Sequence, residues 1–218
     1  MPDASPKKPL RLSEKRIQTR REEILNACAE LYEQMSFREI TLKEIGQRTT
    51  FTRTSIYNYF HSREEIFLAL TRREYEAWAA DLDALRAKAG GADPHRFPAA
   101  LGRTLDARTR LLKLLAMNLY DMEDNARMEH LVAFKTAYNG AVQALRQCLA
   151  AYFPAMTEGD VEDFLYLFLP FMFGLYPYTT VTDKQKEAMR LAGVSYPSLT
   201  AGALACAFTQ KLLAPWLA

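Results

Sequence analysis

The chain has 218 residues, 49% of them hydrophobic and 25% charged, with a formal net charge of +2 at pH 7. This composition is typical of a globular protein and excludes extended disorder or collagen-like repeats for most of the chain. The three cysteines, Cys28, Cys148 and Cys206, lie far apart, so we expect neither a disulfide framework nor a structural zinc site. The basic, polar N-terminus has no apolar core segment, so we expect no signal peptide and a cytoplasmic protein.

Two uncharged stretches, residues 164–182 and 191–210, are long enough to be tested as membrane spans. Prolines, glycines and hydroxyl residues interrupt both, whereas a spanning helix needs about 20 predominantly apolar residues. We interpret them as buried helices of a protein without a membrane partner.

Basic residues gather towards the N-terminus. Residues 1–63 contain 12 Lys and Arg against 8 Asp and Glu, whereas residues 64–218 contain 16 against 18. Short charge runs are usually solvated surface, but a basic end on a slightly acidic body favours contact with a polyanion such as DNA.

The apolar residues recur with a helical period, and no segment alternates like a strand over more than a few residues, which predicts an all-α fold. Residues 1–14, rich in proline and charge, are interpreted as a mobile basic arm. An amphipathic helix is expected over residues 15–35. No internal repeat is evident, so a solenoid is not expected.

A capping box predicts where the second helix begins. Thr41 and Glu44 have the spacing in which each side chain caps the other's backbone, and this opens a helix over residues 41–48. Ile40 and Ile45 have the spacing of the hydrophobic staple that accompanies such a box.

A break of four residues separates this helix from a third one over residues 53–59, for which Thr52 is the expected N-cap. A long fourth helix over residues 62–88 begins with the same capping pattern, formed by Ser62 and Glu65.

The Gly-Gly-Ala-Asp-Pro run at residues 90–94 is the clearest break in the chain. Beyond it, five further helices and one shorter, less regular helix are predicted. The five cover residues 95–107, 109–120, 125–153, 158–176 and 198–214, and the shorter one covers residues 183–192.

Two short capped helices behind a basic amphipathic helix form the pattern of a three-helix helix-turn-helix domain, here over residues 15–74. In this motif the second short helix lies in the DNA major groove. Ile56 and Phe60 give that helix one apolar stripe as an anchor, and Phe51 just before it can fill the same core. Its other side chains offer hydroxyl, guanidinium, amide and imidazole groups for phosphates and base edges.

The residues from Thr41 to Gly46 and from Thr52 to Glu65 resemble the TetR (tetracycline-repressor-like) family of transcriptional regulators. The string Ile-Tyr-Asn-Tyr-Phe-His-Ser-Arg-Glu at residues 56–64 carries the most specific part, and the run 21–37 matches the family's first helix. The resemblance covers about residues 15–75. It implies an all-helical homodimer whose C-terminal domain, here residues 75–218, binds a small molecule and dimerises, with repression relieved by that molecule.

Three positions depart from the family pattern. Thr50 stands where glycine is common, which predicts a strained backbone at the turn. His61 stands where proline is common and Arg63 where lysine is common. The charge of Arg63 at the start of the fourth helix is expected to meet a phosphate.

Eleven residues are candidates for DNA contact. Arg53 and Asn58 carry donors suited to guanine and adenine edges. The backbone N–H of Thr41, at a helix N-terminus, is expected to hold a phosphate, and the resemblance implies that Tyr57 and Tyr59 contact the DNA backbone or thymine methyls. The full set is Thr41, Thr52, Arg53, Ser55, Tyr57, Asn58, Tyr59, His61 and Arg63, with Lys15 and Arg16 adding affinity independent of sequence.

The C-terminal part is rich in large, soft side chains that can line a cavity for a small apolar or aromatic effector, or else fill a core or a dimer interface. The candidates are Trp78, Met117, Tyr120, Met122, Phe134, Tyr138, Phe168, Met172 and Tyr176. The helices over residues 158–176 and 198–214 carry the least charge. The second holds small residues that permit close approach of helix backbones, namely Ala201, Gly202, Ala203, Ala205 and Ala207. We therefore expect these two helices to build a two-fold dimer interface.

Other classes of function are less favoured by the sequence. No GxSxG, P-loop or GxGxxG string is present, so we expect neither an enzyme nor a cofactor. A metal site formed by Asp121, Glu123, Asp124, Glu129 and His130 would make the chain a metal-dependent helical enzyme, but their irregular spacing favours a solvated helix junction. The main alternative is a helical interaction protein whose helix-turn-helix binds no DNA.

Overall fold

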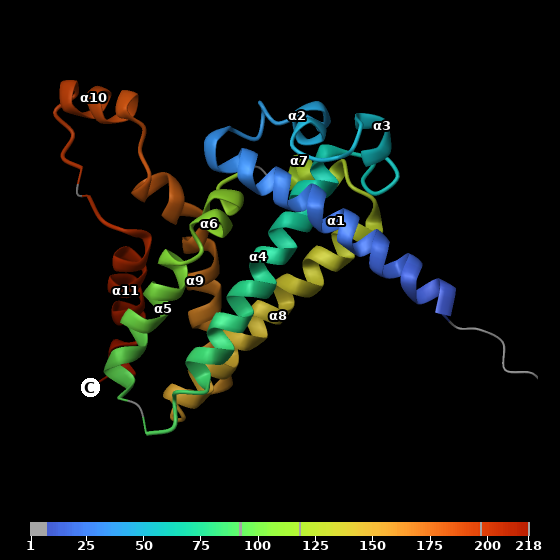
Figure 1. Ribbon diagram of the computed structural model, residues 1–218. Coiled ribbons are helices and arrows are strands. Elements are labelled where there is room, and N and C mark those ends of the chain that lie inside the picture. The colour runs from blue at the N-terminus through green and yellow to red at the C-terminus, as the bar shows by residue number, and fades with distance from the viewer. Residues whose placement is uncertain (1–7, 92, 118, 197, 218) are drawn as a thin grey trace, which may run out of the picture. The chain divides into compact units, whose positions relative to one another are not determined.

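The computed structural model describes residues 8–91, 93–117, 119–196 and 198–217, and every element within these ranges is a helix (Figure 1). The α-helices are α1 (Lys8–Gln34), α2 (Leu42–Gln47), α3 (Arg53–Ile56), α4 (Arg63–Arg86), α5 (Phe97–Asp106), α6 (Thr109–Leu115), α7 (Leu119–Asp124), α8 (Met128–Tyr152), α9 (Glu158–Thr179), α10 (Asp183–Leu191) and α11 (Ala201–Leu212). Short 3-10 helices, η1 (Pro94–Arg96) and η2 (Ala214–Trp216), precede α5 and follow α11. The all-α class predicted from the helical periodicity is confirmed.

The first helix begins earlier than the sequence suggests. Residues 8–14, which the sequence assigns to the arm, form the first turns of α1. Pro9 is compatible with this start because a proline in the first turn of a helix removes no intrahelical hydrogen bond. The remainder of the predicted arm, residues 1–7, lies outside the described residues.

The other helix boundaries follow their capping signals. Threonine capping boxes open α9 at Thr157 and α10 at Thr182, where the sequence places the helices over residues 158–176 and 183–192. The predicted single helix over residues 109–120 is divided between α6 and α7, which have separate bounds.

The chain forms two compact units, and the division differs from the one read from the sequence. The first unit comprises the chain up to Leu70 together with Tyr120–Ala133, and the second comprises Thr71–Leu119 and Phe134–Ala218. The sequence placed a single boundary between residues 74 and 75. A segment from the middle of the chain therefore belongs to the helix-turn-helix unit.

The core of the first unit is built from the apolar faces of its helices. Ile24, Cys28 and Tyr32 lie at intervals of four residues on α1 and are buried, as an amphipathic helix requires. Tyr32 packs edge-on against Phe67 of α4, with ring centroids 5.2 Å apart, and Phe37 contacts the same ring at 4.8 Å.

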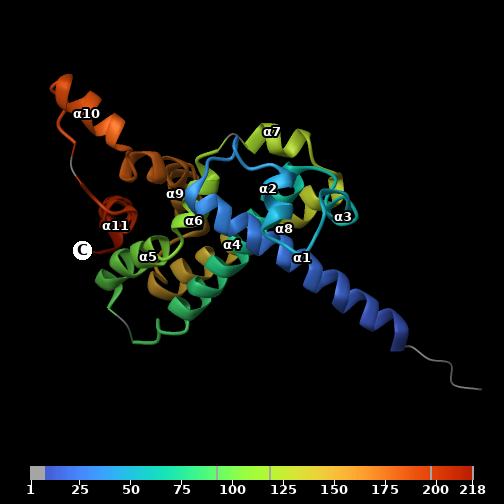
Figure 2. The same ribbon diagram turned by 45° about the horizontal axis from the view of Figure 1, so that its top comes forward.

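In the second unit, α5 and α11 lie side by side, as Figures 1 and 2 both show, and their backbones come unusually close. A Cβ atom added to Gly102 would lie 2.3 Å from the carbonyl oxygen of Gly202. Asp106 of α5 accepts the backbone N–H of Gly202 at 2.6 Å, so α5 also caps the start of α11. Gly202 and Ala205, which the sequence assigned to the dimer interface, are thus buried in the same chain.

Within the described residues, no single helix has the length and apolar character of a membrane span. In the part of the chain that the structure describes, one pair of helices, α9 and α10, bent by 83° at their break, passes that test of length and composition together. Core helices of proteins outside membranes pass it as well.

Candidate nucleic-acid interface

The predicted capping box fixes the start of α2. The Thr41 hydroxyl oxygen accepts the backbone N–H groups of Lys43 and Glu44 at 3.2 and 3.4 Å, and the Glu44 carboxylate accepts the N–H of Thr41 at 3.2 Å. Ile40 and Ile45, the predicted staple, are both fully buried. The N–H of Thr41 that the sequence assigned to a phosphate is therefore bonded to Glu44 in the protein without DNA.

The turn between α2 and α3 is held by α1. Glu23 on α1 accepts the backbone N–H of Thr50 at 3.1 Å and its hydroxyl at 2.9 Å. These two bonds, aided by Arg20, lower the pKa of Glu23. The guanidinium of Arg20 lies 4.9 Å from the ring centre of Phe51.

The predicted strain at Thr50 is wrong. Among the described residues, none other than glycine has a positive φ, and Thr50 is among those described. The turn needs no glycine because Thr50 adopts ordinary backbone angles while Glu23 satisfies its N–H, and the Thr49 hydroxyl accepts the N–H of Phe51 at 3.2 Å.

Residues 52–60 form the recognition segment, which is a short helix followed by a tight turn. Thr52 caps α3 as predicted, since its hydroxyl accepts the N–H of Ser55 at 3.2 Å. The helix ends at Ile56, and the chain continues with the 3-10-type bond from the N–H of Tyr59 to the carbonyl of Ile56, at 2.8 Å. The predicted helix over residues 53–59 is thus only partly α-helical.

Burial divides this segment as the apolar stripe predicts. Ile56 and Phe60 are fully buried, and Phe51 packs edge-on against Tyr59 with ring centroids 5.7 Å apart. Thr52, Tyr57, Asn58 and His61 are exposed, while Ser55 and Tyr59 are half-buried. The side chain of Arg53 lies outside what the structure describes.

Several of these residues surround one surface hollow of about 480 Å³. It is lined by Thr41, Leu42, Lys43, Tyr57, His61, Ser62, Arg63 and Glu64. The structure therefore brings together four predicted DNA-binding residues, Thr41, Tyr57, His61 and Arg63. Lys43 also lines the hollow but was not among the residues predicted to contact DNA. Its place in the first turn of a capped helix is the sequence feature that could have indicated it.

Arg63 has a second set of contacts inside the protein. Its Nη1 donates to the carbonyl oxygens of Phe37 and Ile40 at 3.1 and 3.3 Å, and its guanidinium lies 4.0 Å from the ring centre of Phe37. It also forms an ion pair with Glu64. Arg63 thus fastens the loop between α1 and α2, and its phosphate contact stays a prediction.

Lys15 and Arg16, predicted to add DNA affinity independent of sequence, are exposed on α1.

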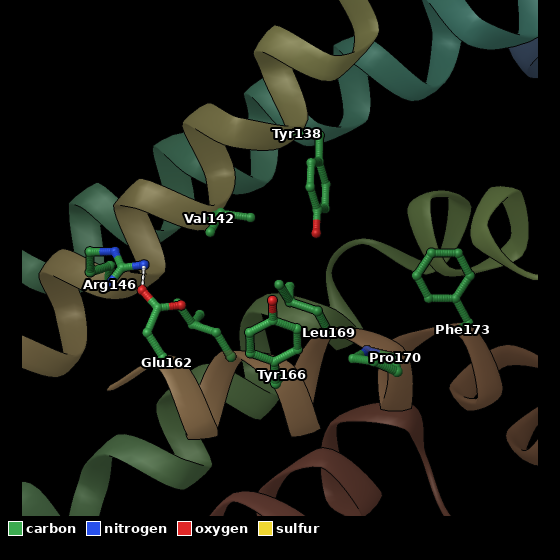
Figure 3. A pocket seen from close by; sticks show the side chains of 9 residues that line it. Tyr138, Val142, Arg146, Glu162, Tyr166, Leu169, Pro170 and Phe173 are labelled. Carbon is green, nitrogen blue, oxygen red and sulfur yellow. Dashed lines mark hydrogen bonds and ion pairs between the residues drawn. The ribbon is translucent and has the colours of Figure 1, made fainter. Parts of the chain in front are cut away.

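The second unit carries a groove between α8 and α9, with a volume of about 570 Å³ (Figure 3). It is lined by Tyr138, Val142, Arg146, Glu162, Leu165, Tyr166, Leu169, Pro170 and Phe173. Tyr138 points from α8 across the groove, Tyr166 points back from α9, and an ion pair joins Arg146 to Glu162 at one end. Burial raises the pKa of Tyr138.

Of the nine residues predicted to line an effector pocket, only Tyr138 lines this groove. Trp78, Phe134, Phe168 and Met172 are buried in the second unit, Met122 is buried in the first, Met117 and Tyr176 are half-buried, and Tyr120 is exposed. Large side chains at helical spacing fill a core as readily as a pocket, and the spacing alone does not separate these roles. Leu165, Leu169 and Phe173 were missed for the same reason.

Two of the residues considered as metal ligands have another partner. Glu129 and His130 both contact Arg127, at 3.0 and 3.1 Å. The side chain of Asp121 lies outside what the structure describes.

Residues 24–70 match the family model described as bacterial regulatory proteins of the tetR family. Residues 72–205, more than half of the chain, match a second model described as the tetracyclin repressor-like C-terminal domain. The chain belongs to the TetR family. TetR-family regulators are DNA-binding transcription factors and not enzymes.

A curated relative matches about a third of this TetR-family chain. The HTH-type transcriptional regulator RutR of Escherichia coli K12 is 27% identical over 70 residues, which are 32% of this chain and 33% of RutR. RutR of Shigella flexneri matches to the same extent. The chain thus spans a third of the length of the curated relatives it matches.

Solved structures of bacterial regulators share the fold over most of the chain. A regulator from Mesorhizobium loti has a TM-score of 0.60 at 12% identity, covering 92% of this chain and 98% of that one. PfmR from Thermus thermophilus has a TM-score of 0.56 at 16% identity, covering 88% and 97%. The fatty acid degradation regulator FadR from Bacillus halodurans has a TM-score of 0.56 at 15% identity, with the same coverage.

Proposed function

We propose that this TetR-family regulator binds a palindromic operator as a homodimer and represses transcription from it until a small apolar or aromatic effector releases it. The observation that carries the proposal is that the recognition segment is anchored by apolar side chains and exposes its polar ones. Ile56 and Phe60 anchor it to the core of the first unit, which leaves Thr52, Tyr57 and Asn58 facing solvent. In a two-fold dimer each segment reads one half-site. The centres of the two half-sites are therefore expected to lie one or more helical turns of DNA apart, at about 34–36 Å for each turn.

Selection of bound sequences from a random double-stranded DNA pool tests the operator. The expected product is an approximate palindrome. Arg53→Ala and Asn58→Ala should each weaken operator binding by about 1–3 kcal/mol and relax the preference at one base position. Lys186→Ala on α10 removes a cation from the second unit and is the matched control, for which we expect unchanged affinity.

Other outcomes of this experiment have distinct meanings. An equal loss on all sequences, with a shallower salt dependence, would assign the substituted residue to a phosphate. Wild-type protein that selects no sequence would contradict the proposal and favour the helical interaction protein.

The groove between α8 and α9 supports the effector part of the proposal. Its volume lies within the range of small-molecule sites, and such sites are mostly apolar with a few polar groups. Val142, Leu169 and Phe173 supply apolar walls, and the hydroxyls of Tyr138 and Tyr166 supply polar contacts. An apolar or aromatic molecule with one polar end is the ligand class that this lining suits.

The helix α4 supplies a route from effector to DNA because it contributes residues to both units. A ligand-induced shift of a packed helix is carried along its length as a rigid-body displacement. A coupling of about 1–3 kcal/mol changes DNA affinity by about 5- to 150-fold, and the operator must weaken an inducing ligand by the same factor.

Native mass spectrometry of the purified protein, followed by titration of any ligand found, tests this part. The ligand should bind more weakly in the presence of operator, and Leu169→Trp, which fills the groove, should weaken the ligand but not the operator. Equal ligand affinity with and without operator would exclude equilibrium control. Unchanged ligand affinity in Leu169→Trp would place the effector elsewhere.

A further inference from the structure

Residues 120–133 belong to the DNA-binding unit although they are distant from it in sequence. Their contacts gather where the chain leaves the recognition segment and enters α4. The Ser62 hydroxyl accepts the N–H of Glu65 at 3.1 Å and donates to the carbonyl of Asn125 at 3.0 Å. The residue that caps α4 therefore also holds the segment between α7 and α8.

These contacts form a junction between the start of α4 and the segment that joins α7 to α8. Glu65 lies at its centre, with only 1% of its surface exposed. Arg127 binds its carboxylate with two parallel bonds, from Nε at 2.6 Å and from Nη2 at 2.9 Å, and adds its backbone N–H at 3.2 Å. The fourth bond comes from the backbone N–H of His61 at 2.7 Å. Two-point pairing of this kind fixes orientation as well as distance.

A buried carboxylate with these partners stays ionised. Burial by itself raises the pKa of Glu65, but the hydrogen bonds from Arg127 and from the N–H of His61 outweigh it and bring the pKa to about 2. Removing one partner from such a pair leaves an uncompensated charge, which the surrounding structure has to accommodate by moving or by taking up a proton.

The junction lies next to the last anchor of the recognition segment. His61 directly follows Phe60, whose ring centre lies 5.6 Å from that of His130 and 4.8 Å from the guanidinium of Arg21. His130 is itself held by Arg127, whose Nη2 donates to its Nε2 at 3.1 Å. The end of the recognition segment is thus fixed at the ring of Phe60, which contacts His130, and the residue after it is fixed at the N–H of His61, which binds Glu65. Both His130 and Glu65 are held by Arg127.

We infer that Arg127 is a positioning residue for DNA recognition: through Glu65 and His130 it sets where the recognition segment stands relative to α4. Arg127 touches neither base nor phosphate in this role. Its loss is expected to misplace the segment and to cost sequence-specific binding, while the electrostatic attraction of the first unit for any DNA remains.

The test compares Arg127→Met with a matched lesion in the second unit. Arg108 binds Asp81 with the same two atoms at the same distances, Nε at 2.6 Å and Nη2 at 2.9 Å. Arg108→Met therefore removes an ion pair of the same bond geometry, with a more exposed carboxylate, from a protein whose DNA-binding unit is intact. Arg127→Lys, which keeps the charge but not the two-point geometry, provides a milder variant if Arg127→Met does not fold.

We expect Arg127→Met to weaken operator binding by about 5- to 150-fold, with non-specific DNA affinity within about twofold of wild type and Arg108→Met unchanged on both DNAs. Hydrogen exchange should show faster exchange of the amides of residues 57–61 in Arg127→Met only. Arg127→Lys should fall between wild type and Arg127→Met.

Three results would overturn the inference. The first is operator affinity within twofold of wild type in folded Arg127→Met or, if that variant does not fold, in Arg127→Lys. The second is the same loss in Arg108→Met, and the third is an equal loss on all DNA with a shallower salt dependence. The inference rests on operator binding, so the wild type is measured first. A wild type without operator preference contradicts the proposed function, whereas an operator preference that Arg127→Met retains contradicts only the positioning role.

Discussion

At the scale of single residues, the buried cluster around Glu65 makes the first unit sensitive to acid. Glu65 binds its proton less readily in the folded protein than in the unfolded chain. Burial lowers the pKa of His130, an effect that Glu65 opposes and that Arg21 and Arg127 reinforce. Both groups therefore take up protons more readily on unfolding, and stability falls as the pH is lowered.

The pH windows follow from these shifts. The contribution of Glu65 is complete above the ordinary pKa of about 4.5 and is lost as the pH falls through about 2. It amounts to something on the order of 3 kcal/mol. The contribution of His130 is complete above about 6.5 and declines below that value. We expect urea unfolding to show a free energy that drops in both windows.

Glu65→Gln should be less stable than the wild type at pH 7 and should lose the drop between pH 4.5 and 2, because the amide does not titrate. His130→Gln should flatten the curve just below pH 6.5 and leave the lower window in place. A Glu65→Gln curve parallel to that of the wild type between pH 4.5 and 2 would show that another group causes the acid loss.

At the scale of helices, local sequence signals determine where a helix begins, whereas tertiary contacts determine how long it is. The threonine caps of α2 and α3 were predicted from the sequence because capping is set by residues three positions apart. The length of α3 was not readable, because the bonds that shorten it after Ile56 depend on the anchoring of Phe60 in the core.

The contact between α5 and α11 gives a prediction at this scale. A Cβ atom on Gly202 would lie 2.3 Å from Oδ2 of Asp106 and 2.5 Å from the carbonyl oxygen of Gly102. Gly202→Ala should therefore destabilise the second unit by about 1–3 kcal/mol, as overpacking of a close contact does. Thermal or urea unfolding measures the effect.

Gly140→Ala is the matched control, because Gly140 lies inside α8 and an added Cβ would meet no atom within 4 Å apart from its neighbours in that helix. This exchange should stabilise the protein by about 0.5–1 kcal/mol, since alanine favours the helix. Gly202→Ala as stable as the wild type would mean that α11 moves away from α5 at little cost.

At the scale of the whole molecule, the dimer interface proposed from the sequence is supported at α9 and revised at α11. On α9, Tyr166, Leu167 and Tyr178 are 77%, 54% and 73% exposed, an unusual density of bare apolar side chains for one helix. The small residues of α11 that suggested a dimer contact include Gly202 and Ala205, which are buried within the same chain.

We therefore expect Leu167→Glu to convert a dimer into a monomer, because a charge placed in an apolar interface is left without a partner. Light scattering at micromolar concentration distinguishes the two states. Val132→Glu adds the same charge at a residue of the first unit with 55% exposure and should leave the dimer intact. A monomeric wild type would end the dimer proposal, and a dimeric Leu167→Glu would move the interface away from this face of α9.

The sequence by itself determined the all-α class, the capped helices of the helix-turn-helix, the buried stripe of Ile56 and Phe60, and the resemblance to the TetR family. All of these depend on residues within a few positions of one another, where helical period and capping chemistry are readable. The extent of the DNA-binding unit was decided only by the tertiary structure.

The reason is that its remaining determinants join distant parts of the chain. Glu65 has the spacing of a capping residue, yet its carboxylate bonds the N–H of His61 and Arg127, 62 positions further on. Glu23 of α1 satisfies the N–H of Thr50, and Gly202 packs against α5 of the same chain. Periodicity reports which face of a helix is apolar, but only packing decides which partner covers it.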